Sequence, residues 1–366
     1  MTKIQKNKRE IFTQTNNWRA IKTALLLFFC IFRAISAVSA QTQDLITWNE
    51  TVGLETESPA SWARMVRLKN GEWLAAYAVF GNPDGSRVRV KKSADEMRSW
   101  TFLTEFGEAG RKLDNANLLQ SSNGDILLAV RSLIDKKSYR VQVYKSLDNG
   151  KTFNLLSIID ANEDPGEAAD VGLWEPFLIE LAPNKLAVFY ASEKYSKATP
   201  AFSQIIAEKI STDGGKTWGA EIRAVAEPGK SRPGEPNVLK FSDKKYALFY
   251  EVCGSENCAG HFSVSKNGVD WPGKIGELIP DVFQNPQAGA IDEKTFFVTS
   301  NNARIIFTRN AGKSWHLNSP AFAFSSWGAF YQTKKDEIAL VTGTKKSEKD
   351  PNRILIRFGK INLPVR

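Results

Sequence analysis

The stretch Ser211-Thr-Asp-Gly-Gly-Lys-Thr-Trp218 constrains the fold more than any other part of the chain. Asp213 can accept hydrogen bonds from backbone N–H groups of its own turn, as the acidic residue of an Asx-turn does. Gly214 and Gly215 permit the positive φ that a chain reversal requires. Trp218 then opens the returning strand and can pack back over the turn. Taken alone, the stretch predicts one β-hairpin.

The same pattern occurs five times, so it counts structural units along the chain. The copies start at Ser93, Ser146, Ser211, Ser265 and Thr308, at intervals of 53, 65, 54 and 43 residues. The copy at 146 is nearly as complete as the one at 211. The copy at 265 is one residue shorter, the copy at 308 has Thr and Asn in place of Ser and Asp, and the copy at 93 lacks the glycine.

Between these turns the chain repeats apolar runs of strand length that are bounded by Asn, Asp and Gly. These runs lie in residues 67–77, 119–131, 178–190 and 238–250. A period of about 50 residues with four strands in each unit is typical of a β-propeller. Five units with the turn, together with the tail that holds residues 337–343 and 353–359, predict six blades.

No long helical periodicity follows residue 40, so we expect an all-β, six-bladed β-propeller that forms a single domain over residues 41–366. The early segment Asp44–Trp48 is expected to pair with the last blade and close the ring. Closure would remove the exposed edges that an open sheet presents.

The N-terminus has the features of an export signal. Basic residues precede the apolar run Ala24–Phe32, and small residues end at Ala40. The alternative is a membrane anchor, but nine apolar residues stopped by Arg33 fall short of the roughly 20 needed to span a bilayer. We therefore expect residues 1–40 to be a cleaved signal peptide, the mature protein to be secreted or periplasmic, and no membrane association after cleavage.

The charge of the chain excludes one class of partner. The formal net charge is +9, but seven basic residues and one acid lie in residues 1–40, so the remainder carries only +3. No basic run comparable to a nucleic-acid site is present. We expect no nucleic-acid partner and a monomeric protein.

Without the signal segment, Cys253 and Cys258 are the remaining cysteines. A pair this close in a secreted chain predicts a disulfide that fixes a loop. A structural zinc site would need four ligands, and His261 is the nearby histidine, so the zinc interpretation is weak. We expect no metal and no other cofactor.

The five turns are similar to the Asp-box of sialidases and their relatives, which are six-bladed propellers. That resemblance implies that the turns lie at the rim and are structural. A second set of motifs resembles the exo-α-1,5-L-arabinanases of glycoside hydrolase family 93, over nearly all of residues 45–360. These motifs are Trp174-Glu-Pro-Phe177, Ser203-Gln204, Arg232-Pro-Gly-Glu-Pro236, Tyr250-Glu-Val-Cys-Gly254 and Gly328-Ala-Phe-Tyr331.

The resemblance implies a retaining exo-hydrolase that releases short arabinose oligomers, typically arabinobiose, from linear arabinan. Retaining hydrolysis uses two carboxyl groups roughly 5–5.5 Å apart, one protonated and one ionised. Glu175 precedes the apolar run Phe177–Ile179, and Glu251 ends the apolar run Ala247–Tyr250. An acid beside a buried strand is costly unless it has a partner or a role. The family pattern implies that Glu175 is the acid/base and Glu251 the nucleophile.

Two further residues belong to the expected site. Glu235 lies in the constrained turn Arg232–Asn237 and is the rival of Glu251 for the second carboxylate. Tyr331 resembles the tyrosine that sialidase-like sites keep beside the nucleophilic carboxylate. We expect it to donate a hydrogen bond that keeps Glu251 ionised, and a tyrosine of the core is the alternative.

Arginines and tryptophans distinguish two substrate classes. A sialidase binds the substrate carboxylate with three arginines, because the guanidinium group pairs with it bidentately. The candidates here are Arg64, Arg131, Arg232 and Arg304. A neutral arabinose polymer instead needs hydrogen bonds and aromatic platforms. We expect Arg64, Arg131 and Glu235, with the platforms Trp62, Trp174 and Trp327, to bind the substrate.

Two other functions stay open at this stage. The chain could be a sialidase that acts on anionic sugars, which would require three arginines converging beside Tyr331. It could also be a non-catalytic propeller that binds carbohydrate or protein, since propellers host many functions. The arabinanase prediction requires Glu175 and Glu251 to meet across the mouth of the channel.

Overall fold

The computed structural model describes residues 43–165, 171–301, 303–345 and 352–362. The expected signal peptide, residues 1–40, lies outside these ranges. Within them, no helix is long and apolar enough to cross a membrane. The described chain from Asp44 onward is one compact unit.

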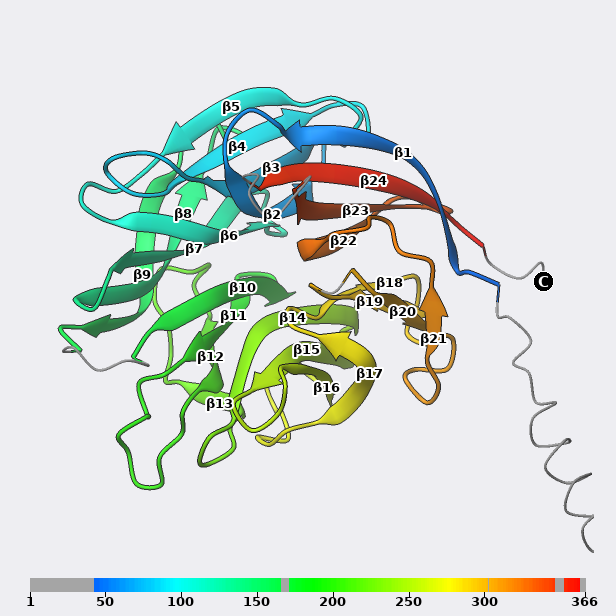
Figure 1. Cartoon of the computed structure of the whole chain (residues 1–366). Helices are drawn as coiled ribbons and strands as arrows, with labels where there is room; N and C mark the ends of the chain where they lie inside the picture. The colour runs from blue at the N-terminus through cyan, green and yellow to red at the C-terminus, as the bar shows by residue number, and fades with distance from the viewer. Residues whose placement is uncertain (1–42, 166–170, 302, 346–351, 363–366) are drawn as a thin grey trace, which may run out of the picture. The chain divides into compact units, whose positions relative to one another are not determined.

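Six four-stranded antiparallel sheets are arranged in a ring, so the predicted all-β six-bladed propeller is confirmed (Figure 1). In five blades the strands follow one another in chain order from the centre outward. The first strands of neighbouring blades contact one another around the central channel. The first three blades consist of β2 (Ala60–Arg67), β3 (Trp73–Val79), β4 (Arg87–Ser93) and β5 (Thr101–Phe106); β6 (Lys112–Gln120), β7 (Ile126–Ile134), β8 (Ser138–Ser146) and β9 (Asn154–Glu163); and β10 (Leu173–Ala182), β11 (Lys185–Ser192), β12 (Ile205–Ser211) and β13 (Ile222–Val225).

The fourth and fifth blades consist of β14 (Arg232–Ser242), β15 (Lys245–Cys253), β16 (Ala259–Ser265) and β17 (Glu277–Phe283); and β18 (Gln287–Ala290), β19 (Phe296–Thr299), β20 (Ile305–Thr308) and β21 (His316–Asn318).

The sixth blade combines the two ends of the described chain. The sixth consists of β22 (Ser326–Lys334), β23 (Glu337–Thr344), β24 (Arg353–Ile361) and β1 (Ile46–Glu55). β1 pairs antiparallel with β24, with Ile46 opposite Ile361. The expected closure by the N-terminal segment is therefore confirmed.

The five repeated turns each join the third strand of a blade to its fourth. In the turn that follows β12, Ser211 Oγ donates to Asp213 Oδ1 at 2.8 Å and accepts the N–H of Gly215 at 2.8 Å. The Asp213 carboxylate accepts the N–H of Thr217 at 3.0 Å and its hydroxyl at 2.6 Å. These bonds lower the pKa of Asp213, because they stabilise its ionised form. The turn is thus closed by its own side chains.

The aromatic residue that ends each complete turn holds its blade against the preceding one. Trp218 Nε1 donates to Ser157 Oγ of β9 at 3.0 Å, and Trp271 Nε1 donates to Glu208 of β12 at 3.1 Å. Phe153 stacks on Phe106 of the first blade at 5.6 Å between ring centroids. Six clusters of buried apolar side chains likewise combine residues from two neighbouring blades each. The hydrophobic core therefore lies between the blades.

One acidic side chain, Glu208, lies within this core. Glu208 is fully buried, and its Oε1 has no hydrogen-bond partner. Burial raises the pKa of this carboxyl to about 9, against the opposing bond from Trp271 and the charge of Lys185. The group therefore holds its proton at neutral pH.

We predict that Glu208→Gln abolishes one pH-dependent component of stability. The unfolded chain releases the Glu208 proton near pH 4.5, whereas the folded protein keeps it until about pH 9. The stabilisation that Glu208 contributes through its raised pKa is fully present below pH 4.5. It is lost as pH rises toward 9, by at most about 1.4 kcal/mol per pH unit. The melting temperature of Glu208→Gln minus that of the wild type should rise between pH 5 and pH 8. A difference that does not change with pH, like that expected for the exposed Glu57→Gln, would contradict the assignment.

Candidate active site

Six equivalent residues encircle the channel, one from each blade. In five of the inner strands a β-bulge places one residue at positive φ, two positions before the residue at which strand pairing resumes. In the fifth blade the equivalent residue stands two positions before β18. These residues, here called the ring positions, are Trp62, Asn115, Glu175, Glu235, Asn285 and Trp327, with φ between 49° and 59°.

Positive φ is uncommon outside glycine, and strained residues gather at functional sites. Trp62, Glu175, Glu235 and Trp327 are among the site residues expected from the sequence, whereas Asn115, Asn285 and the repeat that relates all six are not. The sequence does contain a signal for it. A small residue or proline follows every ring position: Ala63, Ala116, Pro176, Pro236, Pro286 and Gly328.

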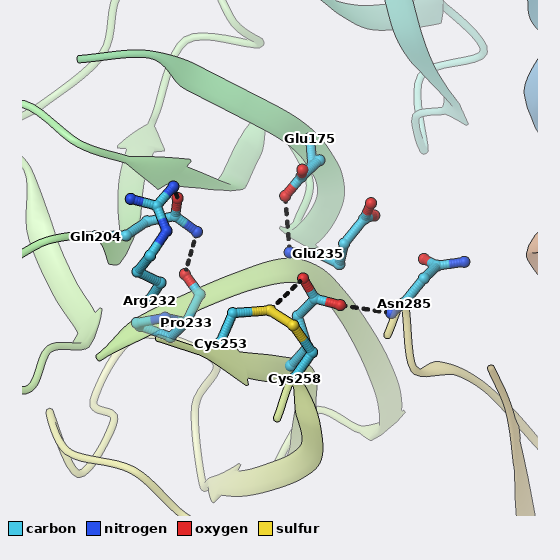
Figure 2. Close-up of a disulfide and its surroundings, with 9 residues drawn as sticks. Glu175, Gln204, Arg232, Pro233, Glu235, Cys253, Cys258 and Asn285 are labelled. Carbon is cyan, nitrogen blue, oxygen red and sulfur yellow. Dashed lines mark hydrogen bonds between the residues drawn. A yellow bond between two sulfur atoms is a disulfide. The ribbon is translucent and has the colours of Figure 1, made fainter. Parts of the chain in front are cut away.

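The ring places Glu175 and Glu235 on adjacent inner strands, β10 and β14. The backbone N–H of Glu235 donates to Glu175 Oε2 at 2.8 Å (Figure 2). Glu251 lies on β15, directly opposite Gly234 in the β14–β15 ladder. A Cβ atom at Gly234 would stand 2.7 Å from Gln204 Nε2 and 3.4 Å from Glu175 Oε2. Glycine at this position therefore leaves room for the Gln204 amide, whereas Glu175 Oε2 stands at an ordinary contact distance.

The surroundings of Glu251 leave it with one strong donor. Its Oε2 accepts the backbone N–H of Asn285 at 2.7 Å. Its Oε1 lies 3.3 Å from Cys253 Sγ, but that sulfur carries no proton because Cys253 and Cys258 form a disulfide. The predicted disulfide is therefore present, and Figure 2 shows it beside Glu175, Glu235 and Asn285. In the described part of the chain, Glu251, Cys253 and Cys258 are the one cluster of metal-ligand types, and the disulfide uses both sulfurs.

Burial raises the pKa of all three carboxyl groups, and the charges of neighbouring carboxylates add to the rise at Glu175 and Glu235. Burial, and then the charge of Glu251, raise the pKa of Glu175 from 4.5 to about 7. Burial and the charges of Glu175 and Glu251 raise the pKa of Glu235 well above its usual value, against Arg64 and Arg131. Burial also raises the pKa of Glu251, although the N–H of Asn285 and the charge of Arg232 oppose it. Because like charges at one site cannot all ionise, at least one carboxyl holds a proton at neutral pH.

Two cavities meet at Glu175. The larger, of about 420 Å³, is lined by Glu175, Glu251, Trp174, Tyr139 and Arg232 among others. The smaller, of about 20 Å³, holds on the order of one water and is lined by Glu175, Glu235, Trp62, Arg64 and Asn115 among others. Glu175 therefore belongs to both, whereas Glu251 lines only the larger and Glu235 only the smaller.

Tyr331 does not lie where the sequence analysis expected it. Its hydroxyl accepts the backbone N–H of Met65 at 2.8 Å, and the ring packs edge-on against Trp73. It lines a third cavity, which Glu251 does not reach. The expected hydrogen bond from Tyr331 to Glu251 is thus wrong, because the Tyr331 hydroxyl lies against Met65 of β2.

Three of the four candidate arginines are held by protein carboxylates. Arg131 pairs bidentately with Asp114, which lies opposite it in the β6–β7 ladder, with both contacts at 2.6 Å. Arg232 pairs with Glu193, and Arg304 with Asp281. Arg64 instead donates to the backbone oxygens of Ala63 and Trp327. The four guanidinium groups do not form the three-arginine clamp that a sialidase requires.

The three candidate tryptophans occupy two places in the site: Trp174 stands apart from the packed pair Trp62 and Trp327. Trp174 lines the larger cavity, with the Arg131 guanidinium 4.4 Å from its ring centroid. Trp62 and Trp327 pack edge-on against each other at 5.5 Å, and Trp62 packs likewise against Phe80 at 5.4 Å. All three are half-buried. The larger cavity is thus lined by two packed aromatic rings, Tyr139 and Trp174, as well as by its carboxylates.

Comparison with known proteins shows the likeness of the fold. The α-L-arabinanase of Penicillium chrysogenum, solved with arabinobiose, is 20% identical with a TM-score of 0.72, and the match covers 86% of this chain and 99% of that one. The family 93 α-L-arabinofuranosidase of Fusarium graminearum, also solved with arabinobiose, is 18% identical with a TM-score of 0.70, covering 84% and 97%. The sialidase of Trypanosoma rangeli is 14% identical with a TM-score of 0.53, covering 86% and 58%.

No protein-family model matches the sequence, and neither does any curated protein. At these identities the likeness is one of fold alone. The chain therefore has the sialidase-like propeller fold, and its structural neighbours include family 93 arabinan-degrading enzymes.

We predict that Glu251→Gln lowers the pKa of Glu175 by about one unit, because it removes a negative charge beside that carboxyl. ¹³C NMR of labelled glutamate carboxyl groups measures the shift directly and does not depend on any activity. Glu293→Gln changes an exposed glutamate that pairs with Lys245, and it is expected to leave the Glu175 titration unchanged. An unchanged Glu175 titration in Glu251→Gln would show that the two carboxyls do not interact.

Proposed function

We propose that this protein is a retaining, exo-acting glycoside hydrolase that cleaves α-1,5-linked L-arabinan and releases arabinobiose. One observation carries the proposal: Glu175 and Glu251 line one cavity of about 420 Å³, with the pKa of Glu175 raised to about 7. A retaining site needs one carboxyl that keeps its proton near neutral pH and a second that can ionise beside it. The fold supports the proposal, since relatives of that fold were solved with arabinobiose.

In the proposed mechanism Glu175 is the acid/base and Glu251 the nucleophile. Glu175 protonates the glycosidic oxygen while a carboxylate oxygen of Glu251 forms a bond to the anomeric carbon, and the bond to the leaving sugar breaks. A water then attacks the anomeric carbon of the glycosyl-enzyme and gives its proton to Glu175, which releases Glu251. Glu251 Oε2 is held by Asn285, which leaves Oε1 free of hydrogen-bond donors and able to attack.

Glu235 takes a supporting part in this proposal. Its backbone N–H holds Glu175 Oε2, and its side chain lines the smaller cavity and not the one that contains Glu251. With the side-chain amide of Asn285 turned to satisfy its neighbours, Asn285 Nδ2 donates to Glu235 Oε2 at 3.1 Å. Glu235 thus connects Glu175 to the loop that holds Glu251, which suits a positioning residue better than a nucleophile.

A neutral substrate fits the cavity better than an anionic one. Arg131 and Arg232 already pair with Asp114 and Glu193, so neither has a free bidentate face for a substrate carboxylate. Trp174 and Tyr139 offer apolar ring surface in the same cavity, and the polar groups of Gln204 and Lys136 can bind hydroxyls. A sialidase is the second candidate, because the fold also matches sialidases. A non-catalytic propeller would not need the raised pKa of Glu175.

The proposal includes export of the protein, supported by the basic and apolar segments before Ala40 and by the Cys253–Cys258 disulfide. Disulfides persist in oxidising compartments. Secretion or periplasmic localisation would bring the enzyme to an extracellular polysaccharide.

The first functional prediction concerns products. Incubated with linear 1,5-arabinan, the wild type should release arabinobiose, and it should not cleave a sialoside. Glu175→Gln and Glu251→Gln should each lose about 10³-fold or more in kcat/KM, while Glu293→Gln keeps full activity. Chromatography of the products measures both arms. Cleavage of the sialoside alone would refute the proposal, and full activity in Glu251→Gln with loss in Glu235→Gln would make Glu235 the nucleophile.

The second functional prediction separates the two carboxyl roles. With an activated aryl arabinoside and added azide, Glu175→Ala should yield a glycosyl azide of retained configuration, because azide replaces water on the covalent intermediate. Glu251→Ala should yield the inverted azide, because azide attacks the substrate directly. Proton NMR of the anomeric centre distinguishes the two products. Inverted product from Glu175→Ala would exchange the two assignments.

A pH profile gives the third prediction. Glu175 must be protonated for the first step, so kcat/KM should fall as pH rises through about 7. Glu175→Gln should lack this alkaline limb. A wild-type profile that stays flat from pH 6 to pH 9 would exclude Glu175 as the general acid.

A further inference from the structure

A third cavity, of about 340 Å³, lies in the channel and takes no part in the proposed reaction. Its lining includes the residue two positions after each ring position, so it forms a second tier of the same six-fold arrangement. These six residues are Arg64, Asn117, Phe177, Asn237, Gln287 and Ala329. Tyr331 also lines it. We call this space the donor cavity, for the hydrogen-bond donors described next.

Two amide groups present N–H donors to the donor cavity. Asn117 Oδ1 accepts the N–H of Leu178 at 3.0 Å, and Asn237 Oδ1 accepts the N–H of Ala288 at 2.9 Å. Each amide oxygen is fixed by a backbone N–H of the next blade. The NH₂ group of the same amide therefore lies on the side away from that N–H. Asn117 and Asn237 are each 6% exposed, and no hydrogen bond joins either NH₂ group to a described residue. Neither nitrogen is fully enclosed by protein, so each can donate to a water or a ligand in the cavity that both residues line.

Arg64 and Tyr331 add a positive charge and a hydroxyl donor. Arg64 Nη1 donates to two backbone oxygens, and no carboxylate in the described ranges forms an ion pair with it. The Tyr331 hydroxyl accepts the N–H of Met65, so its own proton is left to donate. Burial raises the pKa of Tyr331, so that proton stays in place at neutral pH. Four donor groups thus face one space.

No ionised carboxylate among the described residues of the two cavities pairs with Arg64. Arg64 lowers the pKa of Glu235, but burial and the charges of Glu175 and Glu251 raise it, and Glu235 therefore keeps its proton. Glu180 also lines the cavity, but its carboxylate accepts the N–H and hydroxyl of Ser122 and forms no ion pair with Arg64. A water molecule accepts about two hydrogen bonds and carries no charge. A small anion accepts more and also balances the charge of the half-buried Arg64.

We propose that the donor cavity binds a small monovalent inorganic anion, such as a halide, between Arg64, Asn117, Asn237 and Tyr331. Gln287 Oε1, a buried acceptor without a partner, stands in the same lining and needs a donor such as a water beside the anion. Arg64 also lines the small cavity with Glu175 and Glu235. The anion therefore lies one side chain away from Glu175 and Glu235.

Bromide provides a direct test, because its anomalous scattering identifies it in a crystal. Halide-free crystals of the full chain, soaked in sodium bromide, should show an anomalous peak among the four donor groups. In solution, the melting temperature should rise with the logarithm of the sodium bromide concentration above the dissociation constant, and it should not do so with sodium gluconate of equal ionic strength. Density for water alone, or an equal rise in both salts, would overturn the proposal.

Variants test the donors one at a time. Arg64→Met should raise the bromide dissociation constant at least about tenfold. Tyr331→Phe removes one donor with little change of shape. Asn117→Asp can still accept the N–H of Leu178 but puts a carboxylate oxygen in place of the NH₂ group, so it should also weaken bromide binding.

Lys240→Met is the matched control, since Lys240 lies at the edge of the same cavity but already donates to Leu181 and pairs with Asp243. It should respond to bromide as the wild type does. Unchanged bromide affinity in Tyr331→Phe and Asn117→Asp would refute the site even if Arg64→Met fails to fold. None of these measurements depends on glycoside hydrolysis, so their failure leaves the proposed function to its own tests.

Discussion

The pairing of β1 with β24 is the interaction on which the ring depends. These two strands come from opposite ends of the described chain, and their ladder runs from the Ile46–Ile361 pair to the Glu55–Ile354 pair. Without it, the sixth blade would have three strands and an open edge, and the first blade would lose part of its apolar contact with the sixth. Every inner strand is positioned by two neighbours, so a gap at one blade would loosen all six. The site geometry therefore rests on a contact far from the site.

Within the closed ring, the channel has a layered chemistry. The ring positions supply the carboxyls, amides and tryptophans of the mouth, and the residues two positions later supply the donors and the arginine below. Arg64 belongs to the lower tier but influences Glu235 in the upper one. Among the described residues, no ion pair joins Glu175, Glu235 or Glu251 to a basic side chain, so protons balance part of the charge at the mouth. The pKa of Glu175 is raised by burial and then by the charge of Glu251.

Much of the fold could be predicted from sequence because its signals are local. Each repeated turn is closed by residues within a few positions of one another, such as Ser211, Asp213 and Thr217. The pairing of Glu175 with Glu251 could be anticipated because each acid adjoins an apolar strand. Three contacts could not be predicted: the hydrogen bond between Met65 and Tyr331, the ion pair of Arg232 with Glu193, and the hydrogen bond from the Asn285 N–H to Glu251. These contacts join residues that are distant in sequence, and no local sequence pattern indicates which blades are neighbours.

The bulges that create the ring positions have a consequence for how such a protein can change. Each bulge is set by the backbone of its inner strand, and the same conformation holds a tryptophan, an asparagine or a glutamate in different blades. The scaffold thus separates the location of a functional group from its chemical identity. An exchange of one residue at a bulge could convert an acidic mouth into an aromatic or amide-lined one without disturbing the blades. Propellers of this kind are suited to acquiring new substrates through single substitutions, with stability carried by the contacts between blades.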